Sequence, residues 1–204
     1  MLITEQQQLL QIFPNAGHRA GFFVPGETMD LRTVRRSIVE PALLLLPAKM
    51  ESPQAVVMLL AIGLQESLFE HRRQQGNEPA RRFWQMERGG GVHGVLTHRA
   101  SAACAAVICA HQDVEPNDMA VWQAFERDDV LACALARLLL YTDPSRLPDL
   151  GDEAGAWDLY LPTWRPGAYS RGNAVQRTEL RKKWVSNYAA VLEVLRSPRP
   201  VSKP

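Results

Sequence analysis

The stretch that decides the fold is residues 52–66, which read SPQAVVMLLAIGLQE. Ser52 suits a helix N-cap, because its hydroxyl can accept a backbone N–H of the first turn, and Pro53 suits the first helical position. The residues that follow are nearly all apolar, without the polar face of a surface helix, which is typical of a helix packed inside a domain. The sequence therefore predicts a central, buried helix that ends near Glu66.

Helical patterns flank this segment on both sides. Apolar residues recur at helical spacing from about residue 30 to 45, where Pro41 is expected to kink or divide the helix. Start and stop signals predict further helices over residues 4–12, 99–110, 117–125, 127–141 and 174–195. We therefore expect a mostly helical single domain over residues 1–196 with at most a small sheet, and a disordered tail over residues 197–204.

The segment from Glu70 to Gly94 predicts a long irregular loop. It is polar, contains Pro79 and the run Gly89-Gly90-Gly91, and shows neither helical nor strand periodicity. Loops of this length are uncommon inside compact domains unless they serve a site. We therefore expect this loop to form one wall of a cleft.

Composition argues against several classes of protein. The chain has 23 basic and 22 acidic residues, so no overall field favours nucleic acid or an anionic membrane. The first residues lack the pattern of a secretory signal, and no apolar run approaches the ~20 residues that span a bilayer. We expect synthesis in the cytoplasm and no membrane insertion. Cys104, Cys109 and Cys133 lie in alanine-rich helical patterns and are expected to be buried without disulfides.

Glu66 is the candidate catalytic residue, because a carboxylate at the end of an apolar helix is out of place. Burial would keep its carboxyl group protonated near neutral pH, and a general acid needs such a proton for the leaving oxygen. The alternative is that Glu66 is a surface residue in the last turn of an amphipathic helix.

Two motifs, residues 65–69 (QESLF) and residues 83–86 (FWQM), resemble the opening motifs of the lysozyme superfamily, especially goose-type lysozymes and lytic transglycosylases. Arg82 stands where that group usually has glycine. Residues 164–167 (WRPG) resemble its third motif, with the asparagine lost. Trp184 and residues 187–189 (NYA) resemble the last helix of that group. Separately, residues 9–16 (LLQIFPNA) resemble the start of phage endolysins of the glycoside hydrolase 19 type.

The resemblance implies a lysozyme-like fold and cleavage of peptidoglycan glycan strands by a phage or prophage protein, acting on the wall after release or as part of a virion with other phage proteins. Glu66 would protonate the glycosidic oxygen and then act as base. The product is an anhydro sugar if the base takes a proton from the sugar's own hydroxyl, and a hydrolysed end if it activates water. Candidate second carboxylates are Glu70, Glu78 and Glu87, each of which can instead be a solvated loop charge.

The same resemblance implies the substrate-binding residues. The amide of Gln85 would give a donor and an acceptor to the sugar, while Trp84 or Trp164 would offer an aromatic face, with Tyr160 in the same group. Trp84 can equally belong to the core. Ser67 either orients the carboxylate or caps the loop.

Neither a metal nor another cofactor is expected. The residues His93, His98, Cys104, Cys109 and His111 fit no usual zinc spacing, and no strand pattern precedes the glycine run as a phosphate loop requires. The basic group on the last helix, from Arg177 to Lys183, is expected to be solvated rather than to contact nucleic acid.

Two other functional classes stay open. A catalytically silent structural or virion-associated protein could keep a lysozyme-like scaffold, and the departures at Arg82 and Arg165 favour it. A cytosolic interaction module could use exposed aromatic residues between Trp157 and Tyr169, which predicts a contiguous apolar patch and no cleft.

Overall fold

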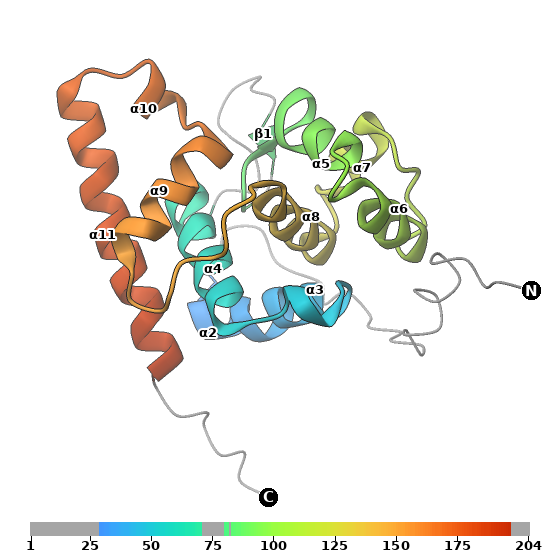
Figure 1. Cartoon of the computed structure of the whole chain (residues 1–204), viewed down its shortest axis with the longest axis horizontal. Helices are drawn as coiled ribbons and strands as arrows, with labels where there is room; N and C mark the ends of the chain where they lie inside the picture. The colour runs from blue at the N-terminus through green and yellow to red at the C-terminus, as the bar shows by residue number, and fades with distance from the viewer. Residues whose placement is uncertain (1–28, 71–79, 82, 197–204) are drawn as a thin grey trace, which may run out of the picture.

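Helix α4 (Pro53–Ser67) runs through the middle of the computed structural model, which describes residues 29–70, 80–81 and 83–196 (Figure 1). Ser52 Oγ accepts the Ala55 N–H at 3.1 Å, and Pro53 lies in the first turn. Residues 55–63 are buried on all sides of the helix. The predicted central helix is therefore confirmed, whereas the predictions for residues 4–12, for the tail 197–204 and for Glu78 lie outside the described residues.

The predicted helix around Pro41 is divided, as expected. It consists of α2 (Leu31–Val34), the π-helix η1 (Arg35–Val39) and α3 (Glu40–Leu44), and η2 (Ala48–Met50) then leads to α4. In a regular α-helix the proline ring would clash with the carbonyl four residues earlier, and the wider π turn makes room for it. Pro41 therefore changes the winding of the helix without ending it.

Four more of the predicted helices are confirmed to within a few residues. They are α6 (Ala102–His111), α7 (Asp118–Ala124), α8 (Asp129–Thr142) and α11 (Ala174–Arg196). Helix α8 is buried from Leu131 to Leu140 and packs against α3, α4 and α6, while α11 lies along α4. The three cysteines are free; Cys109 and Cys133 are buried as expected, whereas Cys104 is only partly buried. The described residues form a mostly helical fold around α4 and α8.

The predicted loop from Glu70 to Gly94 is wrong over its second half. Strand β1 (Ala80–Arg81) pairs antiparallel with β2 (Met86–Glu87), and the glycine run lies in the π-helix η3 (Arg88–Val92), which continues into α5 (His93–Thr97). Glycine costs roughly 1 kcal/mol relative to alanine in a helix, so local propensity disfavours this winding. Burial of Val92 and Val95 in the core offsets that cost.

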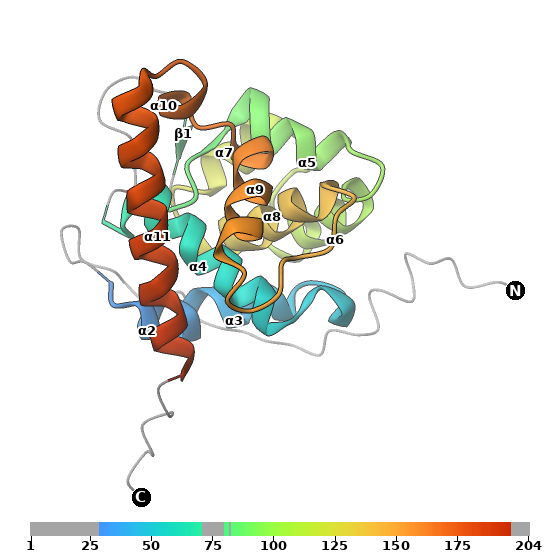
Figure 2. The same cartoon turned by 60° about the vertical axis from the view of Figure 1, so that its left-hand side comes forward.

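Two further helices were not predicted, α9 (Glu153–Trp164) and α10 (Gly167–Ser170). Gly155 and Pro162 hide the helical pattern of α9, although Asp152 Oδ1 caps it by accepting the Gly155 N–H at 2.9 Å. Helix α9 contacts both α8 and α11 (Figure 2), and its Trp157 and Tyr160 are buried between them and α4. Trp157, Tyr160 and Trp164 therefore belong to α9, whereas Tyr169 is exposed on α10.

We predict that Gly63→Ala destabilises the domain, although alanine favours a helix by about 1 kcal/mol over glycine. A Cβ at residue 63 would collide with the Phe69 ring, and that ring is held edge-on by Phe83 and Trp84 at centroid distances of 5.2 and 6.1 Å. Urea denaturation should show a loss of about 1–3 kcal/mol in unfolding free energy.

The matched control for this prediction is Gly89→Ala. A Cβ at residue 89 would meet nothing within 4 Å, so this variant should be as stable as the wild type or slightly more stable. Equal denaturation midpoints for the two variants would contradict the proposed role of the Gly63 contact.

Candidate active site

A pocket of about 610 Å³ lies where the C-terminal end of α4 meets the C-terminal end of α9. Strand β2, the π-helix η3, the start of α10, Leu139 of α8 and Leu180 of α11 also line it. Its polar and charged lining residues include Gln65, Glu66, Gln85, Glu87, Thr163, Arg165 and Arg171. The pocket has the size and the mixed lining of a site for a small ligand or one part of a polymer.

Glu66 lies in this pocket, where its side chain is mostly buried. The Tyr160 hydroxyl donates to Glu66 Oε1 at 2.6 Å. Burial raises the pKa of the Glu66 carboxyl to about 7, and the opposing effects of the Tyr160 hydrogen bond and the Lys183 charge are smaller. Glu66 is therefore not a residue of an open amphipathic face, and its carboxyl group exchanges a proton near neutral pH.

Tyr160 holds the Glu66 carboxyl group. Its ring is 1% exposed and stacks on Trp184 and Trp164, with centroid distances of 4.8 and 6.5 Å. Burial and the neighbouring Glu66 both raise the pKa of the Tyr160 hydroxyl, so it stays a hydrogen-bond donor at all ordinary pH values. Tyr160 also lines the pocket, so its contact with substrate stays a prediction, although its ring is engaged by Trp184 and Trp164.

Ser67 ends the helix and does not reach the pocket. Its hydroxyl lies 3.1 Å from Gly63 O and 3.0 Å from Phe83 O, and it accepts the Phe69 N–H at 3.1 Å. The chain then turns through Leu68 and Phe69, both in the left-handed region with φ of 53° and 56°. The capping alternative for Ser67 is supported, and its predicted contact with substrate is wrong.

Trp84 belongs to the core, which corrects its prediction as a sugar-binding surface. Its side chain is fully buried, and Nε1 donates to Leu59 O at 2.9 Å. Trp84 O accepts the indole N–H of Trp164 at 2.8 Å, and Trp164 itself is partly exposed in the pocket. Gln85 also lines the pocket, from a left-handed backbone with φ of 46°. Within this motif, Trp84 holds Trp164 from the core, and Gln85 lines the pocket.

Two candidate second carboxylates, Glu70 and Glu87, lie in different places. Glu70 is exposed outside the pocket, because α4 ends at Ser67 instead of continuing for the turn that would place both carboxylates on one face. Glu87 lines the same pocket as Glu66. Among the described residues, Glu87 is thus the predicted second carboxylate that shares the site.

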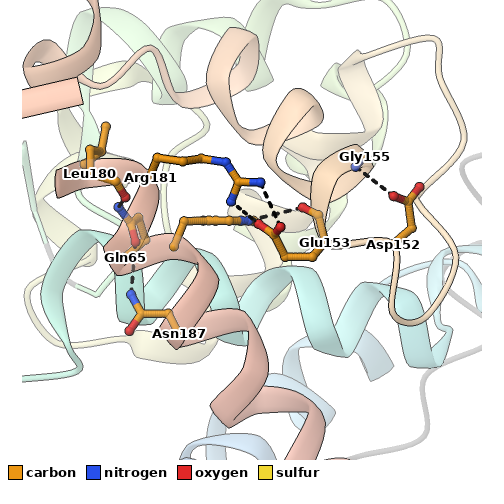
Figure 3. A network of polar contacts seen from close by, with 8 residues as sticks. Gln65, Asp152, Glu153, Gly155, Leu180, Arg181 and Asn187 are labelled. Atoms are coloured by element: carbon orange, nitrogen blue, oxygen red, sulfur yellow. Dashed lines mark hydrogen bonds and ion pairs between the residues drawn. The ribbon is translucent and has the colours of Figure 1, made fainter. Parts of the chain in front are cut away.

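The structure adds functional residues on α11 that sequence reasoning missed. Lys183, interpreted from sequence as part of a solvated basic face, donates from Nζ to Gln65 O at 2.6 Å, and its charge acts on Glu66. The Gln65 side chain donates to Leu180 O at 3.2 Å and accepts from Asn187 Nδ2 at 3.0 Å (Figure 3). The signal in the sequence was the spacing of Leu180, Lys183 and Asn187, which are three and four residues apart and therefore lie on one face of α11.

Helix α9 is fixed to α11 beside this network. The Arg181 guanidinium group forms a bidentate ion pair with Glu153 at the start of α9, in which Nη2 lies 2.8 Å from Oε2 (Figure 3). Arg181 also lies over the Trp157 ring, 5.2 Å from its centroid. The prediction of a solvated face is therefore wrong for Arg181, which joins the two helices that carry Tyr160 and Lys183.

Other candidate features yield no site in the described part of the chain. No group of three or more His, Cys, Asp or Glu side chains there could hold a metal ion. His93 Nδ1 instead lies 2.8 Å from Asp118 Oδ2 at the surface. No single helix of residues 29–70 and 83–196 is long and apolar enough to cross a membrane. Residues 88–97 and 102–111 satisfy that criterion together, but across a bend of 103°.

Comparisons with protein-family models, curated proteins and solved structures give no match to this chain. The resemblance of residues 65–69 and 83–86 to lysozyme motifs therefore stays a prediction. The functional inference depends on the pocket, in which a carboxyl group that titrates near neutral pH faces polar and aromatic side chains.

Removal of the Tyr160 hydroxyl should raise the pKa of Glu66 above about 7, because that hydrogen bond lowers it. We predict this upward shift for Tyr160→Phe, measured by NMR titration of the ¹³C-labelled Glu66 carboxyl. Tyr188→Phe is the control, since the Tyr188 hydroxyl accepts from Gly151 N–H at 3.3 Å and not from Glu66. A downward or absent shift in Tyr160→Phe would contradict the assigned hydrogen bond.

The raised pKa of Glu66 should also make stability depend on pH. Between the ordinary value of 4.5 and about 7, the folded protein binds more protons at this site than the unfolded chain. Unfolding free energy should therefore fall as pH rises through that window, by up to about 3 kcal/mol. Denaturation of wild type and Glu66→Gln at several pH values isolates the effect, since other groups titrate alike in both. Parallel pH curves would show that Glu66 titrates normally.

Proposed function

We propose that this protein cleaves glycosidic bonds in the glycan strands of peptidoglycan, with Glu66 as general acid and then base. One observation carries the proposal: the Glu66 carboxyl lies in a polar pocket, hydrogen-bonded to Tyr160, with a pKa raised by burial to about 7. A group of this pKa is substantially protonated and substantially ionised at the same working pH, which both halves of acid–base catalysis require.

In the first step, protonated Glu66 transfers its proton to the glycosidic oxygen as the bond from that oxygen to the sugar carbon breaks. The positive charge that develops on the sugar ring is next to the new Glu66 carboxylate. Tyr160 donates to that carboxylate and Lys183 adds a positive charge nearby, so both stabilise the ionised form. The carboxylate then accepts a proton from the attacking hydroxyl group, and the acid is restored.

Substrate recognition is assigned to four further pocket residues. The amide of Gln85 supplies a donor and an acceptor for an acetamido or hydroxyl group. Trp164 is held by its hydrogen bond to Trp84 O, so its exposed part offers a fixed aromatic surface for a sugar ring. The guanidinium groups of Arg165 and Arg171 also line the pocket and give it a positive charge suited to carboxylates on the glycan or its peptides.

The product depends on which hydroxyl the base deprotonates. Attack by the sugar's own hydroxyl gives an anhydro end, and attack by water gives a hydrolysed end. Glu87 lines the pocket and is the described carboxylate that could assist water. From the resemblance we also propose that this is a phage or prophage protein, which is made in the cytoplasm and meets the cell wall after release or as part of a virion.

A catalytically silent scaffold is the competing proposal. It is favoured by the hydrogen bond from Tyr160, which satisfies one Glu66 oxygen without any substrate. It is also favoured by Arg165, which stands in the pocket where the resembling enzymes have asparagine.

The decisive measurement is release of muropeptides from purified peptidoglycan, with products identified by mass spectrometry. Glu66→Gln should abolish release, a loss of at least about 100-fold for removal of the general acid. The control Glu51→Gln changes an exposed carboxylate outside the pocket and should leave release unchanged. Wild-type rates should fall as pH rises above about 7, because Glu66 loses its proton there.

Product masses then separate the two chemical outcomes, since an anhydro end is one water lighter than a hydrolysed end. If hydrolysed ends form, Glu87→Gln should slow their release. A folded wild-type protein that releases nothing from several wall types across this pH range would support the silent scaffold.

A further inference from the structure

Two buried amide side chains, Gln65 on α4 and Asn187 on α11, join these helices directly beside Glu66. They are 4% and 9% exposed, and Asn187 Nδ2 donates to Gln65 Oε1 at 3.0 Å. Gln65 Nε2 donates to Leu180 O at 3.2 Å, so α11 holds the Gln65 amide at both ends (Figure 3). The proposed proton transfer uses neither amide, and their burial therefore calls for another role.

The direction of these hydrogen bonds follows from the chemistry of the groups. A main-chain carbonyl only accepts, so Gln65 must turn Nε2 to Leu180 O and present Oε1 to Asn187, which in turn must donate from Nδ2. A buried amide is unfavourable unless such hydrogen bonds replace those that it made to water. Gln65 and Asn187 thus have a single arrangement that satisfies both, whereas two apolar residues would pack there without selecting one.

The main chain of Gln65 is held by the same face of α11. Its carbonyl group lies in the last turn of α4, where the Phe69 N–H that a longer helix would supply is bound by Ser67 Oγ at 3.1 Å. Lys183 Nζ donates to this carbonyl oxygen instead, at 2.6 Å. The Lys183 ammonium group is therefore kept at the residue that precedes Glu66 in the chain.

We propose that Asn187 is a positioning residue for Glu66: through Gln65 it fixes the last turn of α4 on α11, and so holds the Lys183 ammonium group beside the reacting carboxyl. This role rests on the proposed function, since that function makes Glu66 the reacting group. Asn187 does not line the pocket itself. It should therefore affect the rate of the reaction and not the binding of substrate.

Asn187→Leu removes the donor and keeps the approximate size of the side chain. The Gln65 amide is then no longer fixed, and its carbonyl group should move away from Lys183. The Lys183 charge lowers the pKa of Glu66 against the effect of burial, so this pKa should rise above about 7. The other charged or titratable side chains at the pocket are not changed by this substitution, and these are Tyr160 on α9, Glu87 on β2, Arg165 and Arg171.

The test is NMR titration of the ¹³C-labelled Glu66 carboxyl without substrate. Lys183→Met measures the upward shift that follows from loss of the charge. Lys182→Met is its matched control, because Lys182 is exposed and pairs with Glu179 on α11. Asn187→Leu should shift the titration midpoint in the same direction as Lys183→Met, and Lys182→Met should leave it unchanged. In muropeptide release, Asn187→Leu should lower kcat by about tenfold or more with KM unchanged, as for a misplaced catalytic group.

A double variant, Gln65→Leu with Asn187→Leu, separates this role from a purely structural one. Replacement of both amides by apolar side chains leaves neither of them buried without its partner, so the double variant should fold with a denaturation midpoint close to that of the wild type. The raised pKa of Glu66 should nevertheless persist, because Lys183 is still released from the last turn of α4.

A wild-type titration midpoint in Asn187→Leu and in the double variant, while Lys183→Met shifts it, would show that the amides only stabilise the fold and would overturn the role. Equal titration of Lys183→Met and Lys182→Met would overturn it as well. A wild-type protein that releases no muropeptides, although the shifts occur, would instead overturn the proposed function and leave the effect of Asn187 on Glu66 intact.

Discussion

The packing of Phe69 against Gly63 is the contact on which the pocket depends. Two successive left-handed residues, Leu68 and Phe69, turn the chain back so that the ring lies on the helix where residue 63 has no side chain. Each left-handed residue costs about 1–2 kcal/mol. Burial of the ring returns about 1.5–3 kcal/mol, and its edge-on contacts with Phe83 and Trp84 add about 0.5–1.5 kcal/mol each. These contributions offset the cost of the turn, which ends α4 at Ser67, one residue after Glu66.

The pKa of Glu66 depends on its burial and, to a smaller extent, on the aromatic packing between α9 and α11 that fixes Tyr160. Burial is the dominant effect and raises the pKa, while Tyr160 and Lys183 moderate it. Tyr160 can act in this way because its ring is fixed on Trp184, and the Arg181–Glu153 ion pair joins the two helices that carry these rings. A change in how α9 lies on α11 would thus alter the proton affinity of Glu66 without any change in α4.

Two helical segments of π type occur where the sequence has residues that disfavour a regular helix. One precedes Pro41, and the other contains Gly89, Gly90 and Gly91. In both, neighbouring apolar side chains such as Val39 and Val92 are fully buried. The core stabilises these segments against their local preference, and in the second case Gly91 lines the pocket that holds Glu66. Tertiary packing thus stabilises a helical winding that the local residues disfavour.

The sequence by itself determined the parts of this protein whose signals are local. The Ser52 cap with Pro53 and the apolar run fixed α4, Pro41 divided the preceding helix, and the out-of-place carboxylate marked Glu66. Each of these depends on residues within one or two turns, where caps, period and ring geometry act directly. The boundaries of α11 were predicted for the same reason.

Only the tertiary structure decided what surrounds Glu66. Tyr160 reaches it across 94 residues of sequence, and Lys183 reaches the neighbouring Gln65 O across 118. Trp84 looked like a binding surface from its motif, but its ring fills the core, and α9 formed despite Pro162 because its aromatic face is buried. Such contacts leave no local trace in the sequence, since their free energy comes from burial between elements that meet only when the chain is folded.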